Sequence, residues 1–179
     1  DVDPHVTETM LKPLWAAYAL ARSAHERRQP LDLDLPERKL NLGADGRVEK
    51  CVVPARLDAH RLIEEFMILA NVAAAESLES KRQALIYRAH DAPSLAKLES
   101  LREFLRTLEI SLAKSGTLRP SHFNGILSQV KASEHESLVN EVVLRSQSQA
   151  VYSPDNIGHF GLNLDRYAHF TSPIRRYAD

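Results

Sequence analysis

The stretch that decides the fold is the apolar run HRLIEEFMILAN at residues 60–71. Hydrophobic side chains recur at helical spacing within it and beyond it, which predicts a helix from about Asp58 to Lys81. Because the run is apolar nearly all round, we expect this helix to be buried on most sides. Glu64 and Glu65 interrupt the run, and consecutive helical residues point about 100° apart, so at most one of them can easily face solvent.

A carboxylate without access to water must find a partner or take up a proton. One interpretation of the paired glutamates is a structural ion pair with His60, Arg61 or Arg56. The other is a functional site in which one glutamate faces a polar channel. The pattern of residues alone leaves both interpretations open.

Outward from this segment, helical periodicity predicts further helices at residues 7–28, 93–111, 120–131 and 136–149. Strict alternation at residues 31–35 resumes at 39–42, and a glycine-containing turn at 43–46 leads to a return strand at 48–53. This pattern predicts a β-hairpin. A short strand is expected at 83–88. No repeat or linker divides the chain, so we expect one packed α+β unit that is mostly helical.

Composition limits the classes of function. The 179 residues are 44% hydrophobic and 26% charged, as in an ordinary globular protein. The net charge of −1 contrasts with the basic character of free-standing nucleic-acid binders. No apolar run is long enough for a membrane span, so no membrane partner is expected. The single cysteine, Cys51, excludes an internal disulfide and fits a reducing cytoplasm, where we expect the protein.

The C-terminal stretch GHFGLNLDRYAHFTSPIRRY, residues 158–177, combines aromatic rings with arginines. Flat rings can stack on bases, and guanidinium groups match phosphate oxygens. Thr171 and Ser172 precede Pro173, where a helix would begin and an anion would be favoured. Spacing alone also fits a surface loop that is anchored by aromatic side chains, with Arg175 and Arg176 in solvent.

Two motifs in this stretch, HFGL at 159–162 and YAHFTSPIRRY at 167–177, closely resemble the signature of the ribonuclease II/R family catalytic domain, the RNB domain. The resemblance extends to RLIEE at 61–65, IYRAHD at 86–91 and the segments 31–39 and 140–148, with the bacterial ribonuclease R branch the nearer one. It implies the C-terminal portion of an RNB-type catalytic domain with a small β-hairpin and short strands. The implied activity is processive 3′→5′ hydrolysis of single-stranded or structured RNA to 5′-mononucleotides, with Mg²⁺ as cofactor.

Carried over position by position, the resemblance implies that Arg175 contacts the scissile phosphate and stabilises the charge that develops in the transition state. It implies that Glu64 lies at the RNA 3′ end and helps to position the terminal nucleotide. Further contacts to RNA are implied for a second group of residues, namely Arg176, Tyr167, His169, Thr171 and Ser172.

The aspartate cluster that holds Mg²⁺ in this family lies upstream of the matching region. In this chain only Asp1 with Asp3, and Asp32 with Asp34, occur as close pairs, and the eight histidines show no zinc-site spacing. We therefore expect no metal site in the chain, and we expect both ends to be cut points in a longer protein. Implied partners are RNA and the missing parts of the same polypeptide, namely the upstream RNB half and the cold-shock and S1 domains. An RNA-binding or scaffolding homologue without nuclease activity is the alternative.

The chain on its own should neither degrade RNA nor bind Mg²⁺ tightly, because no convergent cluster of carboxylates is visible in its sequence. Incubation of the purified chain with labelled single-stranded RNA and Mg²⁺ measures this. Stepwise release of mononucleotides that persists after repeated purification would contradict the expectation.

Overall fold

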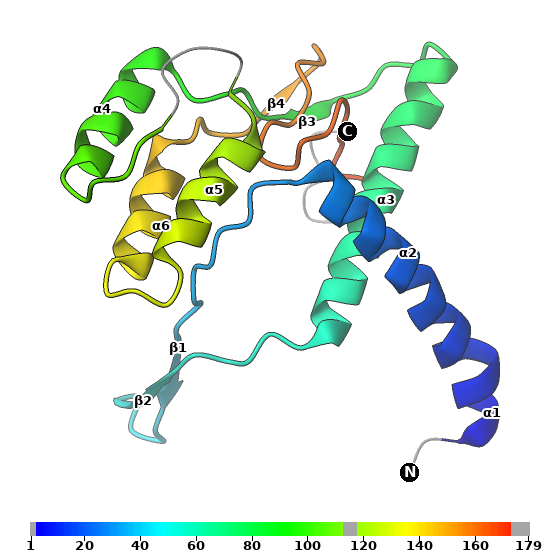
Figure 1. Ribbon diagram of the computed structural model, residues 1–179. Coiled ribbons are helices and arrows are strands. Elements are labelled where there is room, and N and C mark those ends of the chain that lie inside the picture. Colours follow the sequence, from blue (N-terminus) through cyan, green and yellow to red (C-terminus); the bar gives the residue numbers. More distant parts are fainter. Residues whose placement is uncertain (1–2, 113–117, 173–179) are drawn as a thin grey trace.

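The computed structural model describes residues 3–112 and 118–172. The chain forms helices and two small antiparallel strand pairs (Figure 1). Their order is α1 (Pro4–Val6), η1 (Thr7–Leu11), α2 (Lys12–Arg28), β1 (Lys39–Leu42), β2 (Val48–Val52), α3 (Asp58–Ser80), β3 (Tyr87–Ala89), α4 (Leu95–Arg106), α5 (Pro120–Val130), α6 (Glu136–Ser146) and β4 (Val151–Ser153). The expectation of a mostly helical α+β chain with a hairpin and short strands is confirmed.

The first three elements follow one another without a break and form one helical arm. The arm begins at Pro4 and not at residue 7 as predicted, because Asp3 is the N-cap: its side chain accepts a hydrogen bond from His5 N at 2.8 Å. Pro13 therefore lies inside the arm, where it cannot donate to residue 9. The wider π-helical turn of η1 immediately precedes it, and such a turn accommodates the missing hydrogen bond.

The hairpin is shorter than the alternation in the sequence predicts. Within the hairpin region only β1 and β2 pair with each other, whereas residues 31–38 form no β-ladder. In that stretch the amide of Asp32 donates to Asn124 Oδ1 at 3.0 Å and the amide of Asp34 donates to Asn140 Oδ1 at 2.9 Å. Leu31 and Leu33 pack against the core of α4–α6. The alternation is real, but its partners are side chains of α5 and α6, which a local pattern does not reveal.

Helix α3 exposes more of its surface than its sequence predicts. Its buried positions follow one stripe: Leu62, Glu65, Ile68, Asn71 and Ala75. Hydrophobic side chains outside this stripe are partly in solvent, with Ile63 57%, Leu69 45% and Met67 41% exposed. The expectation of burial on most sides was therefore wrong for the described residues. Two of the five buried positions are polar, and both contribute to the site described below.

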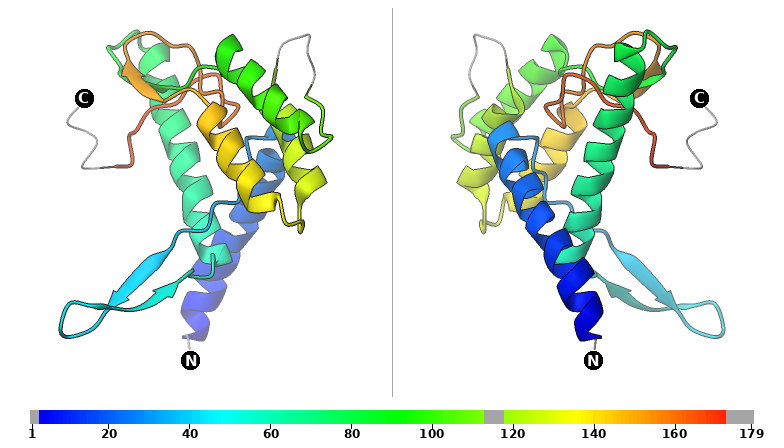
Figure 2. Two further views of the ribbon diagram at one scale, coloured as in Figure 1. Left: turned by 90° about the vertical axis from the view of Figure 1, so that its left-hand side faces the viewer. Right: turned by 90° about the vertical axis from the view of Figure 1, so that its right-hand side faces the viewer.

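The main hydrophobic core joins α4, α5 and α6. Phe123, Leu105, Val139 and Val143 are fully buried there. Figures 1 and 2 show this group on one side of the molecule and the crossed pair of α2 and α3 on the other. Residues 29–38 and 154–172 run between the two groups (Figure 1). The second core cluster is much smaller, and it consists of Ala75, Tyr87 and Ala168 with Leu85 packed against them.

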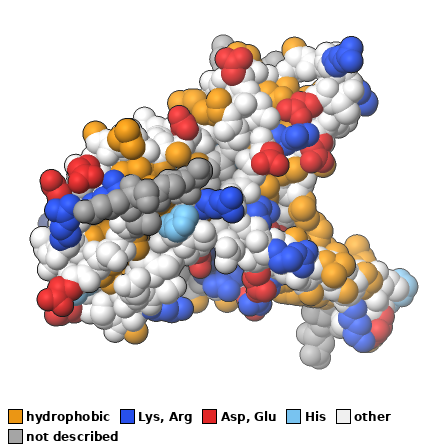
Figure 3. Space-filling model, turned by 45° about the horizontal axis from the view of Figure 1, so that its top comes forward, with side chains coloured by type: hydrophobic (Ala, Val, Ile, Leu, Met, Phe, Trp, Pro, Cys, Tyr) orange, Lys and Arg blue, Asp and Glu red, His pale blue; other side chains and the backbone are white. Residues whose placement is uncertain are grey.

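The N-terminal end of the helical arm and the hairpin project away from these two groups (Figure 2). Figure 3 shows hydrophobic side chains on the surface of the arm. Among them are Met10, Leu14, Trp15 and Leu20, which are 39–74% exposed. Among the described residues, no helix is both long enough and apolar enough to cross a lipid bilayer.

Candidate active site

The segment 165–171 is fixed against α3 and β3 by its backbone and by one tyrosine. Tyr167 is 9% exposed, and its carbonyl accepts a hydrogen bond from Arg88 N at 2.8 Å. Its hydroxyl accepts another from Asn71 Nδ2 of α3 at 2.9 Å. Arg166 forms an ion pair with Glu79, also on α3, at 2.9 Å. We call residues 165–172 the tail, and these contacts anchor it to α3 and β3.

The other residues of the signature follow in the same segment. The amide of Thr171 donates to Asn71 Oδ1 at 2.9 Å, and its hydroxyl is buried without a hydrogen-bond partner among the described residues. His169 Nδ1 is 2.8 Å from the hydroxyl of Tyr152 on β4. Ser172 is partly buried and ends the described part of the chain. Arg175 and Arg176 lie outside the described residues.

Five rings pack edge to face in a column that we call the ring column: Tyr152, His169, Tyr167, His159 and His90. Successive ring centroids are 5.6, 5.7, 5.3 and 4.9 Å apart. Edge-to-face contacts of this kind are attractive and directional. The column therefore ties the tail to β3 and β4.

His90 closes the ring column, and hydrogen bonds hold its imidazole in one tautomer. Nδ1 accepts from Gly161 N at 2.9 Å, and Nε2 donates to the carbonyl of Ser148 at 2.9 Å. A Cβ at Gly161 would lie 3.0 Å from His90 Nδ1, so the close approach suits glycine. Burial lowers the pKa of His90, and burial with the neighbouring His90 lowers the pKa of His159 to about 4.

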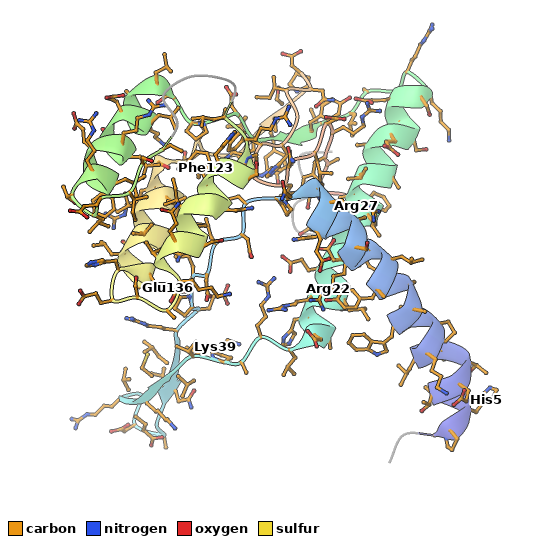
Figure 4. All side chains as sticks on the ribbon, in the orientation of Figure 1. His5, Arg22, Arg27, Lys39, Phe123 and Glu136 are labelled. Atoms are coloured by element: carbon orange, nitrogen blue, oxygen red, sulfur yellow. The ribbon has the colours of Figure 1, made fainter. Side chains whose placement is uncertain are left out.

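Glu64 occupies the open side of α3. Its carboxylate pairs with Arg56, and the two side chains are 49% and 57% exposed. Both line a groove of about 400 Å³ between α2, α3 and residues 30–33. Arg22 of α2 also lines this groove (Figure 4). The ion pair with Arg56 was one of the structural interpretations of the sequence, and it coexists with a position on an open groove.

Of the two neighbouring glutamates, Glu65 is the buried one. Its side chain is 8% exposed, and Oε1 lies 2.6 Å from Nδ1 of His25 on α2. This contact joins the two crossed helices. The expectation that at most one of the two glutamates faces solvent is confirmed, whereas His25 as the partner was not foreseen because it lies 40 residues away.

A second groove of about 370 Å³ brings Glu64 and Tyr167 to one place. Its other lining residues are His60, Ile63, Met67, Ile68 and Leu162, and most of its wall is apolar. Two motifs that are distant in the sequence therefore meet along α3. Asn71, which joins Tyr167 and Thr171, was missed as a member of this site. The signal for it was an amide in an apolar helix, seven residues after Glu64.

On the other side of residues 32–34, the 400 Å³ groove adjoins one of about 350 Å³. Arg56 and Arg61 line both grooves, and Lys131, which directly follows α5, lines the second. Within residues 3–112 and 118–172, no three His, Cys, Asp or Glu side chains converge on a point where they could hold a metal ion.

Comparison with known proteins places these observations in a family. The model of the RNB domain matches residues 3–179. Ribonuclease R of Vibrio cholerae is 40% identical over 176 residues, which cover 98% of this chain and 21% of the relative. The chain therefore spans about a fifth of the length of that relative.

Solved structures agree with the sequence match. Mycoplasma genitalium RNase R in complex with ribose-methylated single-stranded RNA superimposes with a TM-score of 0.89 at 28% identity, and the match covers 100% of this chain and 28% of that one. A yeast pseudonuclease matches with a TM-score of 0.57 at 26% identity, over 70% of this chain and 16% of that one.

The ring column makes stability depend on pH. An unfolded histidine titrates near 6.5, whereas folded His159 stays neutral down to about pH 4. The unfolded state therefore binds the proton first, and the stabilisation present above pH 6.5 is lost as the pH falls towards 4. The melting temperature of the chain should fall over this range, and His159→Gln should reduce the slope. Equal slopes for the two proteins would contradict the assignment.

Proposed function

Because the chain belongs to the RNB domain family, we propose that it is part of a 3′→5′ exoribonuclease. The enzyme hydrolyses single-stranded or structured RNA to 5′-mononucleotides. The observation that carries the proposal is the meeting of Glu64 with the tail along α3, where both line one groove. Identity of about 40% over nearly the whole chain supports it.

The contribution of this chain is one wall of an RNA channel. Charges of both signs line the two adjoining grooves: the arginines and Lys131 can bind phosphates, whereas Glu26, Asp32, Asp34 and Glu136 lie beside them. Arg56 pairs with the Glu64 carboxylate, which then accepts a hydrogen bond from the 2′-hydroxyl of the terminal ribose. Such a contact distinguishes RNA from DNA. The polar groups that contact RNA are thereby fixed before the substrate arrives.

The contact to the scissile phosphate is assigned to Arg175, and further contacts to RNA are assigned to Arg176, His169, Thr171 and Ser172; Arg175 and Arg176 lie outside the described residues. Mg²⁺ bound by the upstream part of the domain would activate the attacking water.

A second candidate is an RNA-binding protein without nuclease activity. The similarity to the yeast pseudonuclease, which extends over 70% of this chain, favours this second candidate. The two candidates differ in the upstream aspartates, which only the enzyme needs. Assay of the intact protein with labelled RNA and Mg²⁺ decides between them, since the second candidate binds RNA and releases no mononucleotides.

Glu64→Gln in the intact protein should lower turnover on the order of 10–10²-fold, because it removes the charge that Arg56 orients. Glu141→Gln is the matched control: Glu141 is 50% exposed and pairs with Arg145 on α6. Exposed ion pairs contribute little to stability, so the control should keep its turnover. Single-turnover hydrolysis at saturating RNA measures both, and equal rates for the two variants would exclude Glu64 from the site.

Arg175→Lys in the intact protein should lower turnover on the order of 10²–10³-fold and change RNA affinity little. A guanidinium can bridge two phosphate oxygens in a fixed plane, whereas a lysine offers a point charge on a flexible stem. Affinity depends instead on many phosphate contacts distributed over the protein.

Arg176→Lys serves as the comparison and should reduce turnover less. Single-turnover rates and filter binding without metal are measured for both arginine variants. Near-normal turnover of Arg175→Lys together with inactive Arg176→Lys would assign the role to the other arginine. Unchanged rates in both would make the arginines structural.

A further inference from the structure

The imidazole of His60 is held in one tautomer by the backbone of Leu57. Nδ1 accepts a hydrogen bond from the Leu57 amide at 3.1 Å, and the amide of His60 donates to the Leu57 carbonyl at 3.0 Å. A ring nitrogen that accepts carries no proton, so the proton of the neutral imidazole lies on Nε2. The exposed ring of His60 therefore offers one N–H donor, at Nε2.

This donor shares the groove of about 370 Å³ with the Glu64 carboxylate. His60 and Glu64 are four residues apart on α3, so their side chains lie on one face, one turn and about 6 Å apart along the helix. Arg56 binds Oε2 of Glu64, which leaves Oε1 for a ligand. In the part of the chain that the structure describes, no hydrogen bond or ion pair joins His60 directly to Glu64. The groove thus offers a ligand one donor and one acceptor at neighbouring positions.

The rest of the groove favours an uncharged ligand. Apart from His60, Glu64 and Tyr167, its lining consists of apolar side chains, namely Ile63, Met67, Ile68 and Leu162. A phosphate would lose water against these side chains and would lie beside a carboxylate. The flat face of a base or sugar would instead bury apolar surface against Ile63 and Met67, which are 57% and 41% exposed. The lining therefore fits a neutral group that has an apolar face and hydroxyls, as a nucleoside has.

We propose that His60 is a specificity-determining residue for the RNA 3′ end. Its Nε2–H donates to the 3′-hydroxyl oxygen of the terminal ribose, while Glu64 accepts from the 2′-hydroxyl. The inference rests on the proposed function, which places the terminal ribose at Glu64. The two hydroxyls lie cis on neighbouring carbons of the ribose, so a donor and an acceptor one helical turn apart can bind both. An RNA whose last ribose lacks the 3′-hydroxyl, or carries a phosphate there, loses the contact with His60.

The test compares the binding of three single-stranded RNAs to the intact protein without metal, so that no hydrolysis intervenes. The RNAs are identical except that they end in a 3′-hydroxyl, a 3′-deoxyribose or a 3′-phosphate. The contacts to the other phosphates are the same in all three, so the ratio of dissociation constants reports the 3′ end alone. The RNA with the 3′-hydroxyl should bind on the order of 3–10-fold more tightly than the 3′-deoxy RNA, as for one hydrogen bond. The 3′-phosphate should bind more weakly still, because it would lie beside Glu64.

Two substitutions separate the donor at Nε2 from the acceptor at Nδ1. In His60→Asn the amide oxygen can still accept from Leu57, but no donor reaches as far as Nε2 did, so the preference for the 3′-hydroxyl should fall to about one. In His60→Gln the longer side chain carries an N–H donor towards the groove, so most of the preference should remain.

His122 provides a matched control on another helix. Its Nδ1 accepts from the amide of Arg119 at 2.9 Å, just as His60 accepts from Leu57, and its side chain is also exposed. His122 lies on α5 and not in the lining of this groove. His122→Asn should therefore keep the full preference for the 3′-hydroxyl. Its melting temperature shows what the same substitution costs the fold where no ligand is involved.

The outcomes separate this inference from the proposed function. If the intact protein shows the expected preference but releases no mononucleotides with Mg²⁺, the nuclease function fails and the recognition of the 3′ end stands. Equal affinities of the unmodified protein for the 3′-hydroxyl and 3′-deoxy RNAs would overturn the role of His60, even in an active nuclease. This comparison needs no variant, so it decides even if His60→Asn does not fold. The role is also overturned if His60→Asn keeps the preference, or if His122→Asn loses it to the same extent.

Discussion

The stripe of α3 that is buried against the rest of the molecule carries two polar side chains, Glu65 and Asn71, and each must be satisfied by a particular partner. A buried polar group without a hydrogen bond costs about 1–3 kcal/mol, so it selects among packing arrangements more sharply than an apolar side chain does. Glu65 selects the crossing with α2 through His25, and Asn71 selects the path of the tail. Most of what surrounds α3 follows from these two requirements.

The sequence predicts the elements well where their signal is local. Helical periodicity identified α3 to within one residue at its C-terminal end, and the turn around Gly46 identified the hairpin. It failed at residues 31–35, whose alternation faces asparagines of α5 and α6 that lie about a hundred positions away. The prediction also failed for the burial of α3, because the hydropathy of a helix does not indicate which other elements pack against it.

The residues of the candidate site also divide into those that a local pattern reveals and those that it does not. Glu64, Tyr167 and Thr171 could be singled out from motifs, since each belongs to a dense match of residues. Asn71 could not, because an amide in an apolar helix is compatible with many roles. Its significance depends on which donor and acceptor the fold brings to it, and these are 96 and 100 positions away. Local patterns reveal what a residue is able to do, while long-range contacts decide what it does.

The α4–α6 group and the tail are stabilised by different kinds of contact, and the contacts of the tail are the kind that a functional site needs. A continuous apolar core stabilises the α4–α6 group. The tail is held instead by hydrogen bonds with Asn71, Arg88 and Tyr152 and by the ring column. Apolar packing tolerates rearrangement, but hydrogen bonds and edge-to-face rings fix direction as well as distance. Side chains that must meet a phosphate in one plane need such support from the residues behind them. The polar attachment of the tail fixes Tyr167 and Thr171 in this way, and it accounts for Asn71 in the buried stripe of α3, as the contact with His25 accounts for Glu65.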